Sequence, residues 1–279
     1  MKKIINKKNM YRLLILIISG LLAYNISKVI YYYFANHKTG KMVEQISKKV
    51  TESTIEDNDL TEIIEDNYYS KTFHLIAVNY ESLKEINEDT IGWLKIAGTK
   101  INYPILKSKD NTYYLNHSFD KKNNPDGWIF LDTRNNSITP DMNNLIYGHS
   151  IPTTALLGEL PGLLRDIDSK DNYTIISTSK WLSNKDNYLI YYNTDSFYSL
   201  WEVFSIYSTK NPISYFNIGY TPTEFNDFIN KIKNESNYNF DTEVNENSKV
   251  LTISSCYYEN PFTVINMAIH AKLIKIQSK

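Results

Sequence analysis

The chain has 279 residues, of which 42% are hydrophobic and 22% are charged, and its formal net charge is -1. This length accommodates one domain with a sizeable core together with accessory segments. Because acidic and basic residues nearly cancel, the composition excludes the strongly basic surface that nucleic-acid binding requires, so no nucleic-acid partner is expected. The single cysteine excludes an internal disulfide.

The N-terminus predicts a membrane anchor. Residues 1–12 are basic and are expected to be cytoplasmic, and residues 13–35 form a largely apolar run, long enough for a membrane span of about 20 residues. Lysines before the run favour an N-terminus inside the cell. We therefore expect a single-pass protein of the cell membrane with an extracellular catalytic part. A cleavable signal peptide is the alternative, because residues 13–23 alone have the length of a signal core, but no small-x-small cleavage site follows.

Residues 36–78 are expected to form an extracellular stalk or N-terminal helices. The spacing of apolar residues up to Asn67 suits one or two amphipathic helices, broken at Asp57-Asn58-Asp59, with a solvated linker as the alternative for the first half. A short helix is expected over residues 79–86. It opens the catalytic domain, which we place at residues 79–279.

From Gly92 onward, short runs of β-branched and aromatic residues alternate with Asn, Asp, Gly, Pro and Lys. This pattern is typical of an all-β domain with closely spaced strands, a barrel or a sandwich. Apolar residues at helical spacing interrupt this pattern at residues 155–167 and 223–232, where we expect two helices. The expected strands are WLKIAG, KINYPIL, GWIFLD, NLIYGH, YTIISTS, YLIYYN and LWEVFSIY, then VLTISSC, a loop, and a last strand over residues 263–276.

Cys256 is the candidate nucleophile. It follows the apolar run VLTI and precedes the polar segment YYENP, so we expect it at the mouth of a strand, facing a cleft. An unpaired thiol outside the cell is exposed to oxidation, which favours a chemical use. A buried, inert cysteine is the alternative, because free cysteines are commonly buried.

Two histidines are candidates for the base that a thiol nucleophile needs. His149 ends the strand NLIYGH, where Gly148 permits close approach and a loop begins. His270 lies on the final strand, which is expected beside the cysteine strand. Spacing alone does not decide between them.

Several motifs, in the same order, resemble those of the class B sortases, membrane-anchored cysteine transpeptidases of Gram-positive bacteria. NLIYGH, ending at His149, resembles the sortase histidine motif, and LTISSC, ending at Cys256, resembles the Thr-Leu-x-Thr-Cys motif. The resemblance runs from about residue 81 to residue 275. It includes the blocks DTIGWLKIAGTKINYPIL, KDNTYYLNHSFD, IFLDTRNN and EFNDFINKIKNES.

The resemblance implies a mainly β fold, the sortase-type eight-stranded β-barrel, with an N-terminal helical subdomain, an inserted helix late in the barrel and one N-terminal transmembrane helix. It implies that His149 and Cys256 meet in one groove. By resemblance, Cys256 cleaves the C-terminal sorting signal of a secreted protein after threonine through a thioester, with His149 as acid and base. An Asn-Pro-x-Thr-like signal and an amine acceptor from peptidoglycan or its precursor are expected, with no cofactor and no metal.

One catalytic position departs from the family. Sortases carry an arginine on the strand after the cysteine, and Asn266 stands there in this chain. A side-chain amide can donate one hydrogen bond to an oxyanion, which is worth about 2.7–4 kcal/mol, but it lacks the charge and the fork of a guanidinium. His270, Lys272 and Arg134 are the candidates to compensate.

Asn111, Tyr114 and Ser255 are expected in the substrate groove by resemblance alone, and Ser255 replaces the usual threonine before the cysteine. Three functions stay open: an active transpeptidase with an altered oxyanion site, a sortase-like binder of sorting signals that turns over poorly, and a thiol peptidase that transfers to water. The presence of both Cys256 and His149 favours the first, because a pure binder has no need of a reactive thiol.

Overall fold

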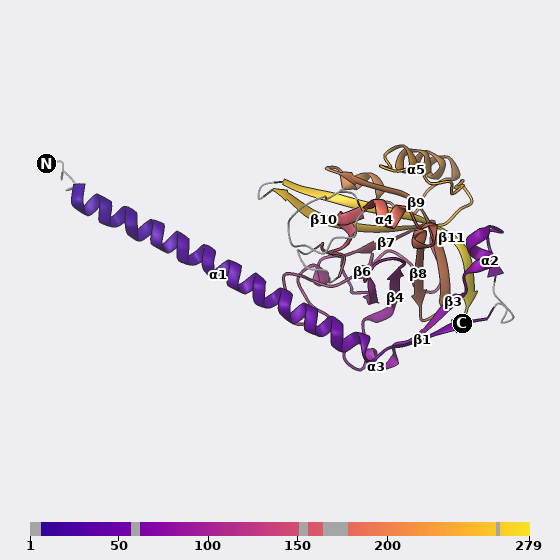
Figure 1. The fold of residues 1–279 in the computed structure, drawn as a ribbon, viewed down its shortest axis with the longest axis horizontal. Helices are drawn as coiled ribbons and strands as arrows, with labels where there is room; N and C mark the ends of the chain where they lie inside the picture. Colours follow the sequence, from indigo (N-terminus) through magenta and orange to yellow (C-terminus); the bar gives the residue numbers. More distant parts are fainter. Residues whose placement is uncertain (1–6, 57–61, 151–155, 164–177, 261–262) are drawn as a thin grey trace.

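A computed structural model describes residues 7–56, 62–150, 156–163, 178–260 and 263–279. Helix α1 (Lys7–Ser47) is continuous over 41 residues, and its N-terminal part projects away from the body while its last turns lie against it (Figure 1). At 1.5 Å per residue α1 is about 60 Å long, twice the hydrocarbon thickness of a bilayer. Its apolar stretch is a candidate membrane span by length and composition, and none of that stretch is buried in the protein.

Eight strands of the described chain close into a barrel. They run in the order β10-β7-β6-β5-β4-β8-β9-β11, and pairing of β10 with β11 closes the ring. The prediction of a mainly β, eight-stranded barrel is therefore confirmed. The strands are β4 (Thr90–Ile96), β5 (Asn102–Leu106), β6 (Phe130–Leu131), β7 (Asn143–Tyr147), β8 (Leu189–Thr194), β9 (Phe197–Thr209), β10 (Val250–Asn260) and β11 (Thr263–Ser278).

Side-chain alternation on β10 separates two hydrophobic cores. Leu251 and Ile253 belong to the main core inside the barrel, whereas Val250 belongs to a second core on the opposite face. Because successive side chains of a strand point to opposite faces, Cys256 shares the outer face with Val250. Cys256, the candidate nucleophile, therefore lies outside the packed interior, on the face of the barrel that α5 covers.

Helix α5 (Pro222–Asn234) confirms the helix predicted over residues 223–232. Thr221 caps it, with Pro222 in the first turn and a reciprocal capping box to Glu224. This combination satisfies two of the free N–H groups that every helix N-terminus leaves. The apolar side of α5 is buried in the second core through Phe225, Phe228, Ile229 and Ile232.

Of the one or two helices predicted up to Asn67, the described residues contain only the last part of α1. The chain then forms β1 (Thr51–Ile55), β2 (Glu62–Ile63), α2 (Tyr68–Thr72), β3 (Leu75–Asn79) and α3 (Glu81–Lys84). β1 pairs with β3, and β2 adds to the edge of β11. TESTI is rich in β-branched residues, which favour a strand once a partner is available. The predicted helix break at 57–59 lies outside the described residues.

Two further predictions are described only in part, and the described part of the first is not an α-helix. Within the predicted helix 155–167, the described part holds turns and the 3₁₀ helix η2 (Leu160–Leu163). The predicted strand YTIISTS is described only at its end, where α4 (Thr178–Leu182) begins. The other short 3₁₀ turns are η1 (Tyr113–Leu115), η3 (Lys185–Tyr188) and η4 (Pro212–Tyr215).

Candidate active site

Parallel pairing of β7 with β10 carries His149 to Cys256. The register sets Tyr147 beside Ser254, and the ladder continues past the end of β7. Gly148 donates its N–H to the Ser254 carbonyl at 3.2 Å, and Ser150 donates to the Cys256 carbonyl at 3.3 Å. His149 is thus held between two inter-strand bonds, and its Nδ1 lies 3.6 Å from Cys256 Sγ.

The other imidazole nitrogen defines the tautomer. His149 Nε2 lies 2.9 Å from the carbonyl oxygen of Leu115, which can only accept a hydrogen bond. Nε2 therefore carries a proton, and in the neutral ring Nδ1 presents its lone pair to the thiol. This arrangement suits a general base that removes the proton of Cys256 and then returns it to a leaving group.

Cys256 lies inside its strand, and the prediction that the strand ends there is wrong. β10 continues to Asn260 because its pairing with β11 extends beyond the cysteine. The thiol is partly buried, and burial raises its pKa. Because burial disfavours the thiolate, the reactive form needs the proton acceptor that His149 provides.

The structure decides between the two candidate histidines. His270 pairs with Thr252, four residues before Cys256 on β10, which is about 13 Å along the strand. It is fully buried, with Nδ1 2.9 Å from Thr252 Oγ1 and its ring stacked on Tyr207. His270 is a core residue and reaches neither Cys256 nor the groove.

This burial makes a testable contribution to stability. Burial lowers the pKa of His270 from 6.5 to about 3. The unfolded chain therefore takes up a proton below pH 6.5 that the folded chain does not, and stability falls as the pH drops from 6.5 towards 3. We expect this group alone to cost about 2 kcal/mol between pH 7.5 and pH 5. Urea unfolding at both pH values checks it: His270→Phe should show a flatter pH dependence, and an unchanged dependence would contradict the assignment.

Asn266 lies directly opposite Cys256 in the antiparallel pair of β10 and β11. Opposed residues of such a pair share a sheet face, with Cβ atoms about 4.5–5.5 Å apart. The side-chain amide of Asn266 therefore stands on the outer face beside the thiol. Both residues line the same groove.

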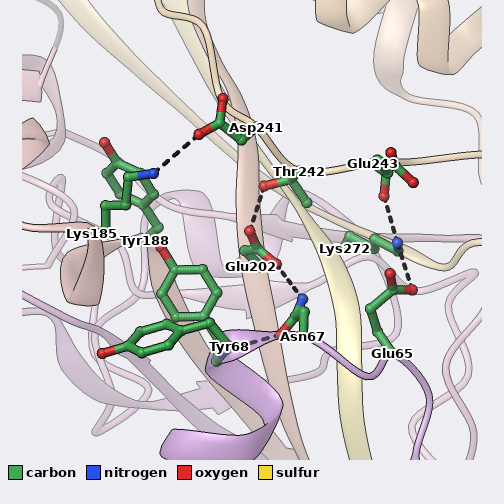
Figure 2. A pocket seen from close by; sticks show the side chains of 11 residues that line it. Glu65, Asn67, Tyr68, Lys185, Tyr188, Glu202, Asp241, Thr242, Glu243 and Lys272 are labelled. Carbon is green, nitrogen blue, oxygen red and sulfur yellow. Dashed lines mark hydrogen bonds and ion pairs between the residues drawn. The ribbon is translucent and has the colours of Figure 1, made fainter.

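Lys272 does not compensate for the missing arginine. It pairs with Val250, six residues before Cys256 and about 20 Å away along the strand. Figure 2 shows its ammonium group between the Glu65 carboxylate and Glu243. This separate pocket has a volume of about 430 Å³, and the ammonium group donates to Glu65 at 2.8 Å and to the Glu243 backbone carbonyl. The Lys272 ammonium group is bound to these acceptors and does not reach the groove around Cys256.

Arg134 lines the groove around Cys256, and hydrogen bonds fix its guanidinium group there. Its Nε and Nη2 donate to the carboxylate of the buried Asp132 at 2.9 and 2.7 Å, and Nη2 also donates to the Phe216 carbonyl at 2.8 Å. The hydroxyl of Tyr147 donates to the same carboxylate. Burial raises the pKa of Asp132, but these hydrogen bonds, above all that from Arg134, together lower it to about 2. Arg134 is thereby fixed at the groove wall.

The groove around Cys256 has a volume of about 460 Å³, a size that suits a few residues of an extended peptide. Asn111 lines it, with its Oδ1 accepting from the N–H of Thr133. Ser255 also lines it, although it is buried and its hydroxyl has no hydrogen-bond partner among the described residues. The remaining lining residues are Leu115, Phe130, Arg134, Tyr147, Gly148, His149, Phe216, Ser254, Cys256 and Asn266.

Tyr114 does not belong to the groove, which corrects its predicted place. It is fully buried, and its hydroxyl donates to Asp89 at 2.6 Å and contacts Asn87. The 3₁₀ turn η1 directs Tyr114 into the core and leaves its neighbour Leu115 at the groove. The sequence pattern around YYL gives no sign of which of these side chains faces inward.

The apolar groove residues Phe130, Tyr147 and Phe216 were not predicted from the sequence. Tyr147 stands in the histidine motif itself, so its position before Gly148 and His149 is a usable signal. Phe216 follows η4 and reaches the groove only through tertiary packing, including edge-to-face contact with Tyr147. No group of His, Cys, Asp and Glu residues that could hold a metal is found in the described ranges.

A closed β-barrel that presents a thiol and an imidazole in one peptide-sized groove defines the class: the chain is a sortase-type cysteine transpeptidase. Its sequence is 32% identical over 193 residues to sortase B of Listeria monocytogenes, covering 69% of this chain and 72% of that protein. The chain therefore belongs to the sortase B family. A comparison with protein-family models gave no match.

Solved structures are similar over the same barrel. A Bacillus anthracis protein described as similar to sortase B shares 27% identity with a TM-score of 0.64, over 88% of this chain and 98% of that one. A Staphylococcus aureus sortase B–substrate complex shares 28% identity with a TM-score of 0.59, over 70% and 84% of the two chains. A sortase B complexed with triglycine shares 28% identity with a TM-score of 0.60, over 70% and 85%.

Proposed function

We propose that this chain cleaves a C-terminal sorting signal after threonine through a thioester on Cys256, and transfers the protein to an amine of peptidoglycan or its precursor. The observation that carries the proposal is the 3.6 Å approach of Cys256 Sγ to His149 Nδ1, with Nε2 fixed on the Leu115 carbonyl. Sortase B relatives solved as a substrate complex and with triglycine support the two substrate classes.

The first half-reaction is acylation. His149 Nδ1 takes the Cys256 proton, the sulfur attacks the threonine carbonyl, and the amide nitrogen leaves with the proton that His149 returns. In the second half-reaction an amine nitrogen attacks the thioester while His149 accepts its proton, and the Cys256 thiolate leaves and takes that proton back from His149. Two acyl transfers replace one direct amide exchange, which is the advantage of a covalent intermediate.

Asn266 is proposed as the side-chain donor to the oxyanion that forms in each half-reaction. It lies on the outer face directly opposite Cys256, and an amide N–H needs no change of protonation to act. Asn111 and Ser255, which line the groove, are proposed to hold the peptide. Arg134 is bound to Asp132, which supports a role in shaping the groove wall rather than in replacing the family arginine.

The N-terminal part of α1 is proposed as an uncleaved membrane anchor. Residues 13–35 would span the bilayer, residues 1–12 would lie in the cytoplasm, and the catalytic domain at residues 79–279 would be extracellular. The apolar surface of α1 and its lack of burial over the candidate span support this placement.

The test uses the full chain in detergent with a library of Asn-Pro-x-Thr-like peptides, with and without triglycine as the amine probe, and Cys256→Ala as control. We expect cleavage after threonine and a peptide–triglycine product identified by mass spectrometry. Cleavage with no triglycine product would identify a peptidase that transfers to water. Binding with no cleavage would identify a sortase-like binding protein, and either outcome contradicts the proposal.

A further inference from the structure

The last turns of helix α1 are bound to the loop of residues 116–127, which connects η1 to the strand β6. Thr39 of α1 is fully buried in this contact. Its hydroxyl donates to Asp126 Oδ2 at 2.6 Å and accepts from Asn124 Nδ2 at 2.9 Å. A buried hydroxyl that bonds a carboxylate and an amide at once fixes their relative positions, because none of the three has water as a substitute partner.

Two outer contacts extend this interface along α1. The hydroxyl of Tyr31, at the outer end of the proposed span, donates to Asn123 Oδ1 at 3.2 Å, and the Lys38 ammonium lies 3.4 Å from the Asp120 carboxylate. Such exposed contacts contribute little energy individually. They show that α1 follows the loop over more than two helical turns, so the buried Thr39 bonds are part of an extended interface.

The same loop reaches the carbonyl that holds His149. Gly127 follows Asp126 with φ +61°, a left-handed conformation, and a Cβ there would lie 2.3 Å from the Tyr114 carbonyl oxygen and 2.9 Å from that of Leu115. The backbone of the loop therefore packs directly against the Leu115 carbonyl. Trp128 donates its N–H to the Tyr114 carbonyl at 2.9 Å and fixes the two segments together.

Charge gives a second link between the loop and the catalytic pair. Burial raises the pKa of Asp126, while its hydrogen bond from Thr39 and the charge of His149 lower it. The Asp126 carboxylate thus lies within electrostatic reach of the His149 imidazole.

We propose that Thr39 of α1 is a positioning residue for His149, acting through Asp126 and the Leu115 carbonyl. Helix α1 is then part of the architecture that sets the reactivity of the thiol, in addition to any role as an anchor. The inference rests on the proposed function, in which His149 serves Cys256, but its test does not require a sorting signal.

The test measures alkylation of Cys256, the only cysteine of the chain, by iodoacetamide between pH 5.5 and 9 in the full chain in detergent. Thr39→Val keeps the shape of the side chain and removes the hydroxyl, which leaves Asp126 and Asn124 without this partner. We expect the alkylation rate at pH 7 to fall about 3- to 10-fold, the effect of one lost hydrogen bond, and the profile to move to higher pH. Thr39→Ser, which keeps the hydroxyl, should restore the wild-type profile.

Thr51→Val on the exposed strand β1 is the matched control and should leave the profile unchanged. Asp126→Asn is the second variant; it retains an acceptor for Thr39 but removes the charge, and should also move the profile to higher pH. An unchanged profile in Thr39→Val and Asp126→Asn would overturn the inference. So would faster alkylation in both, since that reports general loosening. If the wild-type chain transfers no peptide, the proposed function fails, while the alkylation comparison still decides this inference.

Discussion

Replacement of His149 by glutamine is expected to lower the rate of sorting-signal cleavage by about 10²–10⁴-fold, the usual contribution of a general acid–base group. Glutamine retains a donor for the Leu115 carbonyl, so the groove should persist, but it takes up no proton from Cys256. The rate constant for acylation of Cys256 by a labelled sorting peptide measures the effect. Peptide affinity should change little, because His149 acts on the thiol and the leaving amine.

His37→Gln provides the matched control, because His37 is exposed on α1 and has no role in the proposed chemistry. It should retain the wild-type rate. If His149→Gln retained most of the activity and His270→Gln abolished it without loss of stability, the assignment of the base would be wrong.

Replacement of Asn266 by alanine is expected to lower the acylation rate by about 10²–10³-fold, the cost of one oxyanion donor. The reason is geometric: Asn266 opposes Cys256 across the β10–β11 pair. Alanine removes the donor without adding bulk or charge to the groove. Because the oxyanion forms only during reaction, the loss should appear in the rate constant and not in peptide binding.

Asn266→Arg tests the same position by placing a guanidinium there instead of removing the donor. Arginine restores the donor of the family with a permanent charge and a bidentate fork, so this variant should keep or exceed the wild-type rate. A wild-type rate in Asn266→Ala would show that the side chain gives no stabilisation. The oxyanion would then be held by other donors of the groove.

The sequence predicts the barrel because its strands carry a strong local signal. The runs that became β4, β5, β7 and β8 are dense in β-branched and aromatic residues between turn residues, and this pattern matches a half-buried strand. The segment after α1 lacks that signal. β1 is almost wholly exposed, so its side chains show no alternation of burial, and its apolar spacing fits a helix equally well.

The site depends on strand register, which the sequence does not contain. By spacing alone His149 and His270 are equal candidates, and the resemblance of NLIYGH to the sortase histidine motif favours His149. The pairing of Ser254 with Tyr147 and of Thr252 with His270 gives the physical reason. Lys272 was a reasonable candidate by alternation, but it lies too far along β11. Thr39 lies on the helix face that Met42, Val43 and Ile46 mark by their spacing, but the sequence does not show which loop this face contacts.

The most direct test of the catalytic assignment is intact-protein mass spectrometry of the full chain mixed with a sorting peptide and quenched in acid. We predict an added mass equal to the peptide up to its threonine, located on Cys256 by fragmentation, absent in Cys256→Ala, and removed on addition of triglycine. Cleaved peptide in the absence of any such adduct in the wild-type chain, with equal cleavage by Cys256→Ala, would contradict the assignment.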